Sequence, residues 1–224
     1  MTGPRDYGPV QLADYLGLPR WQLERALAAG LVPAPDRARG RWSAAIADDA
    51  LARIDAVRAA AGSVPDLGAV RAAEILTARL GTAVSAGGVA ELARRGLIRV
   101  ASYYKSWPVY DGRDLEAFSD PAAAADATRA GQLRTADESA AYLRIRRSDF
   151  DHLPRAGLLV PADWGHGPYD TRRQFSVPLY RTGDLDGLAA RPDIDWAAAR
   201  AATSGQRSPL AALPSPAPGR NTRP

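Results

Sequence analysis

Cysteine is absent from this 224-residue sequence, and its absence excludes several kinds of site at once. No disulfide, thiolate zinc site, iron–sulfur cluster or cysteine nucleophile can form. Histidine is scarce as well, since only His152 and His166 occur, fourteen residues apart, which is not a metal-ligand spacing. We therefore expect no metal site, and we expect both histidines to be structural or exposed to solvent.

The common catalytic and phosphate-binding motifs are missing too. Neither G-x-x-x-x-G-K-[ST] nor G-x-G-x-x-G occurs, and there is no G-x-S-x-G elbow and no H-E-x-x-H pair. No apolar run approaches the roughly 20 residues that a membrane span needs, and the first residues lack the apolar core of a secretory signal. These absences predict a cytoplasmic protein that is not an enzyme and that has neither a cofactor nor a membrane partner.

Lysine is almost absent, because Lys105 is the single lysine among 29 basic residues. So strong a bias towards arginine, beside abundant alanine, is typical of a GC-rich bacterial genome, and part of the arginine content therefore reflects codon usage. The net charge of +4 and the pI of about 9.7 are mildly basic. They are compatible with an anionic partner and do not require one.

What the chain does contain is an internal repeat. Three helix-like stretches end in glycine and leucine, at Gly30-Leu31, Gly96-Leu97 and Gly157-Leu158. Fourteen residues separate Leu16 from Gly30, and fourteen also separate Leu143 from Gly157. Five residues separate the members of three later pairs, which are Ile46 and Leu51, Tyr110 and Leu115, and Tyr180 and Leu185. Shared spacing on both sides of a shared glycine indicates three copies of one unit, with Ile46 standing where the other copies have tyrosine.

The third copy gives the clearest order of elements. Thr135 is expected to cap a first helix, with Glu138 completing a capping box. Ser148 is expected to cap a second helix that turns Phe150 and Leu153 inward.

Gly157 is expected to end that second helix in the left-handed conformation that glycine adopts without steric cost. A hairpin and a third helix should follow. We predict a strand at residues 158–160, a turn at 165–168 and a returning strand around 175–180. Thr182 or Asp184 should then cap the third helix.

The order helix, turn, helix, wing, helix resembles the winged helix-turn-helix of MerR-type regulators and of phage excisionases. The matching residues of the third copy are 135–143, 157–161 and 180–185. The second copy, through 95–98, 107–110 and 114–118, is more similar to the excisionase variant, and the first is similar through 12–18 and 30–33. The resemblance implies a mainly α fold with small β-hairpin wings, arranged as three tandem winged helix-turn-helix units.

The predicted boundaries follow the repeat. The three units occupy residues 1–57, 68–119 and 134–203. Residues 58–67 are interpreted as a linker and hinge, and residues 120–133 as a linker or a short alanine-rich helix. Residues 204–224 are rich in proline and serine and are predicted to be disordered.

In helix-turn-helix proteins the second helix reads bases in the major groove from its N-terminal half. The family resemblance implies that the wing reaches phosphates or the minor groove, and arginine suits both tasks. In the first copy the candidate DNA-binding residues are Arg20, Trp21, Gln22 and Arg25 in the second helix, and Arg37, Arg39 and Arg41 in the wing. In the third copy they are Arg144, Arg146, Arg147 and Ser148 near the second helix, and Arg172 and Arg173 in the wing.

The second copy is expected to be the weakest reader of DNA. Its second helix begins near Ser85 without long donors, and its wing contributes Lys105. We expect Tyr103, Tyr104 and Trp107 to pack under that wing, with stacking on DNA or contact with a protein as alternatives. In the third copy Asp149 and Asp151 are interpreted as favourable charges at the positive end of a helix dipole.

Together these patterns predict binding to double-stranded DNA by linked modules that gain from effective concentration. A transcription regulator, an excisionase-like factor or a plasmid or phage maintenance protein, associated with the nucleoid, would fit. The alternative is a protein-interaction scaffold, in which exposed aromatic residues such as Trp21, Trp42, Tyr103 and Trp107 contact a protein partner or a second copy. The DNA hypothesis requires the arginines of the first and third copies to face one polyanion.

Overall fold

The computed structural model describes residues 6–166 and 176–214. Helices make up 53% of the chain, and the strands within these ranges form small antiparallel sheets, so the fold is mixed α/β with helix predominant. The chain divides into two compact units. The first unit comprises Met1–Leu80 with Ala93–Asp120, and the second comprises Gly81–Leu92 with Pro121–Pro224.

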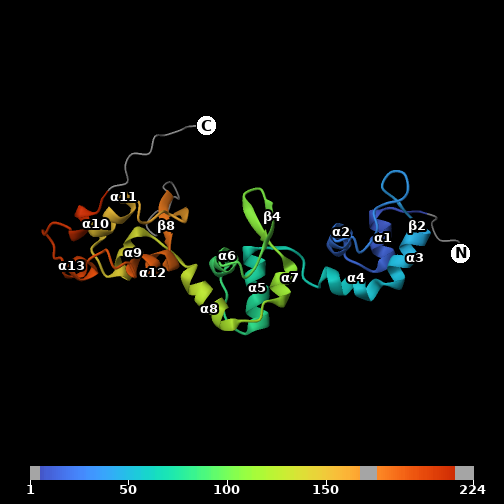
Figure 1. Ribbon diagram of the computed structural model, residues 1–224, viewed down its shortest axis with the longest axis horizontal. Helices are drawn as coiled ribbons and strands as arrows, with labels where there is room; N and C mark the ends of the chain where they lie inside the picture. The colour runs from blue at the N-terminus through green and yellow to red at the C-terminus, as the bar shows by residue number, and fades with distance from the viewer. Residues whose placement is uncertain (1–5, 167–175, 215–224) are drawn as a thin grey trace. The chain divides into compact units, whose positions relative to one another are not determined.

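The first unit begins with a segment that has its own core. Its elements are β1 (Asp6–Tyr7), α1 (Pro9–Leu16), α2 (Arg20–Ala28), β2 (Trp42–Ser43), α3 (Ala44–Ala52) and α4 (Ile54–Ala61) (Figure 1). β1 pairs antiparallel with β2, which sets Tyr7 opposite Trp42. Leu12, Leu16 and Leu23 are buried with these two rings in one cluster. The apolar stripes of α1 and α2 therefore close on a shared core.

Left-handed glycines end the second helix-like stretch of each repeat, as the sequence predicts. Gly30, Gly96 and Gly157 have φ of 69°, 74° and 69°. In the first segment Gly17, with φ of 60°, also ends α1, and its N–H donates to the carbonyl oxygens of Ala13 and Asp14. Glycine adopts this conformation without the steric cost that a Cβ brings.

The rest of the first unit contains a three-stranded sheet and two helices. Its elements are β3 (Leu67–Gly68), α5 (Ala69–Leu80), β4 (Val100–Tyr104), β5 (Trp107–Tyr110) and α7 (Gly112–Ala117). The strand order is β3-β5-β4, so β5 is central and β4 forms an edge. Asp111 caps α7 by accepting the Arg113 N–H at 2.8 Å. Tyr110 and Leu115 are buried beside this cap.

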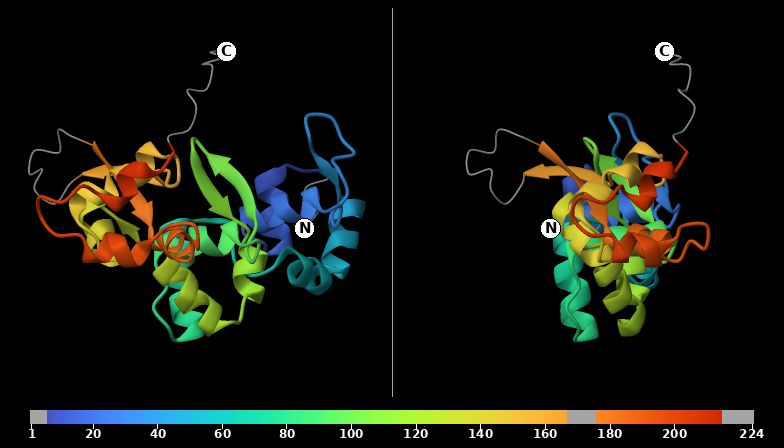
Figure 2. Two further views of the ribbon diagram at one scale, coloured as in Figure 1. Left: turned by 60° about the vertical axis from the view of Figure 1, so that its left-hand side comes forward. Right: turned by 90° about the vertical axis from the view of Figure 1, so that its left-hand side faces the viewer.

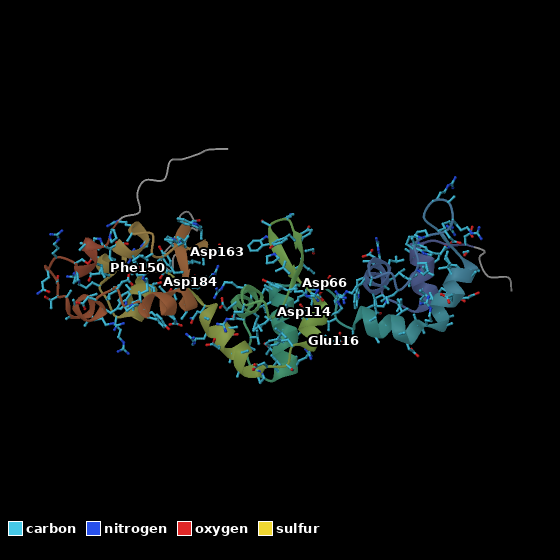
Figure 3. The ribbon with its side chains drawn as sticks, viewed as in Figure 1. Asp66, Asp114, Glu116, Phe150, Asp163 and Asp184 are labelled. Carbon is cyan, nitrogen blue, oxygen red and sulfur yellow. The ribbon has the colours of Figure 1, made fainter. Side chains whose placement is uncertain are left out.

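Residues 58–67, which the sequence suggests as a hinge, are instead held by hydrogen bonds within the first unit. α4 runs into this range. The Gln22 side-chain amide donates to the Gly62 carbonyl oxygen at 2.6 Å. Ser63 donates its backbone N–H and its hydroxyl to the Glu116 carboxylate at 3.0 and 2.6 Å (Figure 3). Residues 58–61 thus belong to α4, and residues 62–66 are hydrogen-bonded to α2 and α7.

The same stretch crosses the start of α7 at very close range. Asp66 accepts the Gly112 N–H at 2.9 Å. A Cβ on Gly112 would lie 2.7 Å from the Pro65 carbonyl carbon, and closer still to the carbonyl oxygens of Val64 and Pro65. Real Cβ atoms essentially never approach a heavy atom below 3.0 Å, so this contact requires glycine.

The second unit contains most of α6 and everything from α8 onwards. Its elements are α6 (Ala86–Arg94), α8 (Pro121–Ala130), β6 (Leu133–Arg134), α9 (Ala136–Leu143), α10 (Arg147–Phe150), α11 (His152–Arg155), β7 (Asp163–His166), β8 (Ser176–Arg181), α12 (Thr182–Ala189), α13 (Trp196–Ala201) and a 3-10 helix η1 (Pro209–Ala212). The helix α8 matches one of the two alternatives for residues 120–133. The sheet order is β6-β8-β7.

Small residues bring α6 and α8 together. Ser85 accepts the Gly88 N–H at 3.0 Å, so the second helix of the middle copy does begin where the sequence predicts. A Cβ on Gly88 would lie 2.9 Å from the Thr128 Cα, and one on Gly87 would lie 2.5 Å from the Gly131 carbonyl oxygen. The two backbones therefore approach as closely as glycine allows.

The capping box of α9 is confirmed, whereas the expected cap of the next helix is wrong. Thr135 accepts the Glu138 N–H at 3.3 Å, and the Glu138 carboxylate accepts the Thr135 N–H at 2.7 Å. Ser148, however, lies inside α10, which begins at Arg147 and has Arg146 at its N-cap without a side-chain cap. The turn before α10 is thus shorter than predicted.

The third hairpin also begins later than predicted. Residues 158–160 form no strand, and β7 starts at Asp163 and includes Gly165 and His166, which the sequence places in the turn. β8 matches the predicted returning strand over its described residues, while Phe175 lies outside them. Thr182 is the first residue of α12 and donates its hydroxyl to the Gln132 carbonyl oxygen at 3.1 Å, so neither it nor Asp184 is the N-cap.

The core of the second unit extends into the segment that the sequence predicts to be disordered. Phe150 and Leu153 are fully buried, as predicted, and Phe150 meets Tyr180 edge to face with centroids 5.2 Å apart (Figure 3). Leu210 of η1 joins the same buried cluster at 3% exposure, and Leu213 packs against it. Disorder is therefore wrong for residues 204–214, and residues 215–224 lie outside the described ranges.

In the first copy the position of the buried tyrosine lies four residues earlier than the sequence predicts. Tyr110 and Tyr180 are buried in β5 and β8, each five residues before a buried leucine of the next helix. In the first copy Trp42 takes that place in β2, five residues before the buried Ala47. Ile46 is only partly buried against the core. The assignment of Ile46 to the tyrosine position is thus wrong.

Candidate nucleic-acid interface

Two of the predicted base-reading side chains of α2 turn into the protein. Gln22 is 7% exposed. The Arg25 guanidinium donates to the carbonyl oxygens of Ala61 and Val64 at 2.6 and 3.0 Å and to the Asp66 carboxylate at 2.6 Å, and its side chain is 11% exposed. Donors that are buried with their acceptors cannot also reach a ligand. The prediction that Gln22 and Arg25 contact DNA is therefore wrong.

Arg20 stays available at the first turn of α2. Its side chain is 77% exposed, and its Nε lies 2.7 Å from the Glu24 carboxylate. An exposed ion pair of this i,i+4 kind contributes only about 0.3–0.5 kcal/mol, so a phosphate can displace it. Trp21 is partly buried, and the Arg25 guanidinium lies 4.9 Å above its ring, which favours packing over contact with DNA.

The three arginines of the loop between α2 and β2 differ in their surroundings. Arg41 donates to the Asp6 carbonyl oxygen at 2.6 Å, so its guanidinium supports the loop. Arg37 lies 3.8 and 3.7 Å from the carboxylates of Asp6 and Asp36 and is 56% exposed, a loose pairing. Arg39 is exposed, and no ion pair or hydrogen bond of its guanidinium occurs within the described residues. Of the trio, Arg39 is therefore the cation without a partner among the residues that the structure describes.

The β4–β5 hairpin exposes the residues that the sequence predicts to pack beneath it. Tyr103, Tyr104 and Trp107 are 69%, 68% and 70% exposed. Lys105 sits at the tip, 5.6 Å from the Tyr104 ring centroid, and is also exposed. The expectation of structural packing is wrong here because the hairpin extends away from α5 and α7 (Figure 2).

In the third copy an ion pair with a buried carboxylate accounts for one predicted DNA contact. Arg146 donates twice to Asp149, at 2.7 Å each, and also to the carbonyl oxygens of Thr203 and Gln206. Asp149 is fully buried and balances this arginine, and it also lies in the first turn of α10, as expected of a charge near the positive end of a helix dipole. The hydrogen bonds from Arg146 hold the pKa of Asp149 below its ordinary value against the opposing effect of burial. Arg146 is therefore structural and leaves the interface.

The remaining cations of the third copy are exposed to different degrees. Arg147 is 44% exposed and pairs with Asp137 at 3.1 Å and with Asp151. Arg144 is exposed, and no ion pair or hydrogen bond of its guanidinium occurs within the part of the chain that the structure describes. Ser148 is exposed beside them. The wing residues Arg172 and Arg173 lie outside the described residues.

Three of these cations share an uncommon backbone conformation. Arg39, Lys105 and Arg144 have φ of 58°, 56° and 59°, and they are the non-glycine residues with positive φ in the described chain. For a residue with a Cβ this left-handed conformation costs roughly 1–2 kcal/mol. At the end of the first helix, the place of Arg144 in the third copy is taken by Gly17 in the first. At each of these three positions the chain therefore has a cation, although glycine would adopt the left-handed conformation at a lower free energy.

These side chains are distributed over both compact units. Arg20, Arg37, Arg39 and Lys105 belong to the first unit, and Arg144, Arg147 and Ser148 belong to the second. The predicted contacts are therefore divided between the two units. The sequence patterns do not predict the positive φ of Arg39, Lys105 and Arg144. For Lys105 a signal does exist, because a two-residue turn between two strands, here Lys105-Ser106, commonly needs positive φ.

Other kinds of site find little support. No cluster of three or more potential metal ligands occurs among the described residues. None of the described helices combines the length and apolar character needed to cross a membrane. A pocket in the second unit beside Gly87 and Gly131 has Arg129 in its wall, but that guanidinium is bound by Asp126 and Asp186. No family model, curated protein or solved structure matches this chain.

Proposed function

We propose that this protein binds double-stranded DNA through three tandem winged helix-turn-helix units, and that it acts as a transcription regulator or a DNA-organising factor of the excisionase or plasmid-maintenance kind. The single observation that carries the proposal is the set of three cations in left-handed backbone conformation. Backbone strain is retained where surrounding structure and function require it, and it gathers at ligand-contacting positions.

The nature of the strained residues supports a polyanionic ligand. Arg39, Lys105 and Arg144 each extend a long cation into solvent from a turn, and none is neutralised by a described carboxylate. Phosphate contacts need donors of this reach and charge. Arg20, at the start of the second helix of the first copy, adds an exposed donor at the position from which a recognition helix reads bases.

The order of elements supports the winged helix-turn-helix assignment. A short strand precedes the first helix of each copy, and the last strand before the third helix returns to pair with it. These pairings are β1 with β2, β3 with β5, and β6 with β8. In such an arrangement the loop between the second helix and the returning strand becomes a wing, and Arg39 and Lys105 lie in those wings.

The strain itself provides the experiment. Arg39→Gly, Lys105→Gly and Arg144→Gly each remove one cation and relieve the left-handed strain, so each variant should be at least as stable to urea as the parent protein. If the cations contact phosphates, each variant should bind a 30-base-pair duplex pool more weakly by fluorescence anisotropy. The slope of log K against log salt should decrease by about 0.9 for each phosphate that the variant no longer neutralises.

Arg53→Ala is the matched control, because it removes one exposed charge at the C-cap of α3 that pairs with Asp49 at 2.5 Å. It should leave the salt slope unchanged. Binding by the parent that does not respond to salt would refute the proposal. Equal affinities for the parent and all three glycine variants would also refute it, because the removed cations would then contribute nothing to binding.

A further inference from the structure

The β4–β5 hairpin presents aromatic rings on both of its faces. Its strands are joined by the two-residue turn Lys105-Ser106, and Tyr104 pairs opposite Trp107 while Tyr103 pairs opposite Pro108. Directly opposed residues share a face of a sheet, and successive residues alternate between faces. Tyr104 and Trp107 therefore share one face, and Tyr103 lies on the other. A core on one side could not bury all three rings.

The charge around these rings is of one sign. Residues 100–110 contain no aspartate or glutamate, and Lys105 stands at the tip. The next carboxylates along the sequence, Asp111 and Asp114, are bound by Arg99 at the base of the hairpin, at 3.1 and 2.8 Å. A ligand that complements this surface must carry negative charge and must also offer planar apolar faces.

A similar pairing in the second unit supports a function for the exposed rings. Trp164 lies opposite Pro178 in the β7–β8 pair, as Tyr103 lies opposite Pro108. Each proline precedes a buried tyrosine of its own strand by two residues, and Trp164 is 61% exposed. The same aromatic–proline pair with similar exposure occurs twice, so the exposure follows from the hairpin design rather than from one accidental side chain.

We propose that the β4–β5 hairpin binds unpaired bases of a nucleic acid, with Tyr104 and Trp107 stacking on base faces while Lys105 contacts the backbone. This inference rests on the proposed function, since the ligand is again nucleic acid, and it adds unpaired bases to the phosphates that Lys105 is proposed to contact. A paired duplex offers only base edges in its grooves, because the faces are stacked on one another. Single strands and opened duplexes offer the faces themselves.

The test compares three labelled probes by fluorescence anisotropy: a 20-nucleotide oligothymidine, an abasic strand with the same number of phosphates, and a 20-base-pair duplex. The parent protein should bind oligothymidine more tightly than the abasic strand. The double variant Tyr104→Ala/Trp107→Ala should lose at least about 5-fold in affinity for oligothymidine, which is the lower end of what stacking on one base supplies. Its affinity for the duplex should not change.

The double variant Tyr104→Phe/Trp107→Phe is the matched control, because it keeps both ring faces and should keep most of the affinity for oligothymidine. Equal binding of the abasic strand and oligothymidine would overturn the inference, and so would an unchanged affinity of the alanine variant. A shift of the alanine variant from dimer to monomer in sedimentation, with strand binding unchanged, would instead assign the hairpin to self-association through β4. If the glycine variants lose duplex binding while the abasic strand binds as tightly as oligothymidine, the proposed function is supported and this inference is refuted.

Discussion

Gly112→Ala should be among the most damaging single-methyl substitutions in the first unit. The new Cβ would lie 2.7 Å from the Pro65 carbonyl carbon and closer to two carbonyl oxygens, all of them backbone atoms. Relief requires the chain at residues 64–66 to move by about an ångström, because the Val64 carbonyl oxygen lies far inside the shortest contact a real Cβ makes. That movement also loosens the Asp66 carboxylate from the Gly112 N–H and from Arg25.

The magnitude follows from two contributions. Overpacking by one methyl group in a tight contact costs typically about 1–3 kcal/mol. Weakened hydrogen bonds to a charged partner add about 1.5 kcal/mol or more. We expect a loss of about 3 kcal/mol, which at about 4 °C per kcal/mol lowers the Tm of the first unit by about 12 °C.

Gly68→Ala is the control for this experiment, because it adds the same methyl group to the same unit at a position with no heavy atom within 4 Å. Differential scanning fluorimetry and urea titration of the full chain should show Gly68→Ala within about 0.5 kcal/mol of the parent. If Gly112→Ala unfolds at the same temperature and urea concentration as Gly68→Ala, then residues 62–66 do not cross α7 as described.

Two further predictions concern the second unit. Asp149→Asn leaves the partly exposed guanidinium of Arg146 without its countercharge, and the loss of these charged hydrogen bonds should cost about 1.5–3 kcal/mol. Because the pKa of Asp149 is lowered in the folded state, its contribution is present above about pH 4 and disappears as pH falls through the folded pKa, so urea titrations from about pH 6 to about pH 2.5 should show a smaller acid loss for the variant than for the parent. Thr135→Ala removes the cap of α9 and should cost about 1 kcal/mol by urea titration, whereas a Thr135→Ser variant that was equally destabilised would contradict the capping role.

Features that depend on a few neighbouring residues could be predicted from the sequence. The capping box at Thr135 and the left-handed glycines such as Gly157 are local, because their partners lie within one helical turn. The burial of Phe150 and Leu153 also follows from spacing along one helix face. The structure has these features at the residues where the sequence predicts them.

The register of the first copy was not predictable from the same kind of spacing. Residues 44–52 are rich in alanine, so spacing alone makes both Ala47 and Leu51 acceptable as the buried position of α3. A strand of two residues such as Trp42–Ser43 carries no periodic signal. The choice between Trp42 and Ile46 is decided by the pairing of Trp42 with Tyr7, thirty-five residues earlier.

The candidate interface was predicted least well, for a related reason. Arginine reaches far, and its partner often lies far away in the sequence. The Arg25 carboxylate partner is forty-one residues away, and two of the Arg146 acceptors are fifty-seven and sixty residues away. No local pattern distinguishes such an arginine from Arg39, whose guanidinium stays in solvent. Only the fold separates structural arginines from those that can meet a ligand.

The lysine at the hairpin tip has a practical consequence. Lys105 carries the single ε-amine of the sequence, and it is exposed. Amine-directed reagents, such as fluorophore esters or short crosslinkers, will therefore modify this side chain at one known place, apart from the terminal amine. A single dye there would report directly on whatever approaches the hairpin, and enzymatic acetylation of that amine would erase the positive charge of the tip without touching any arginine.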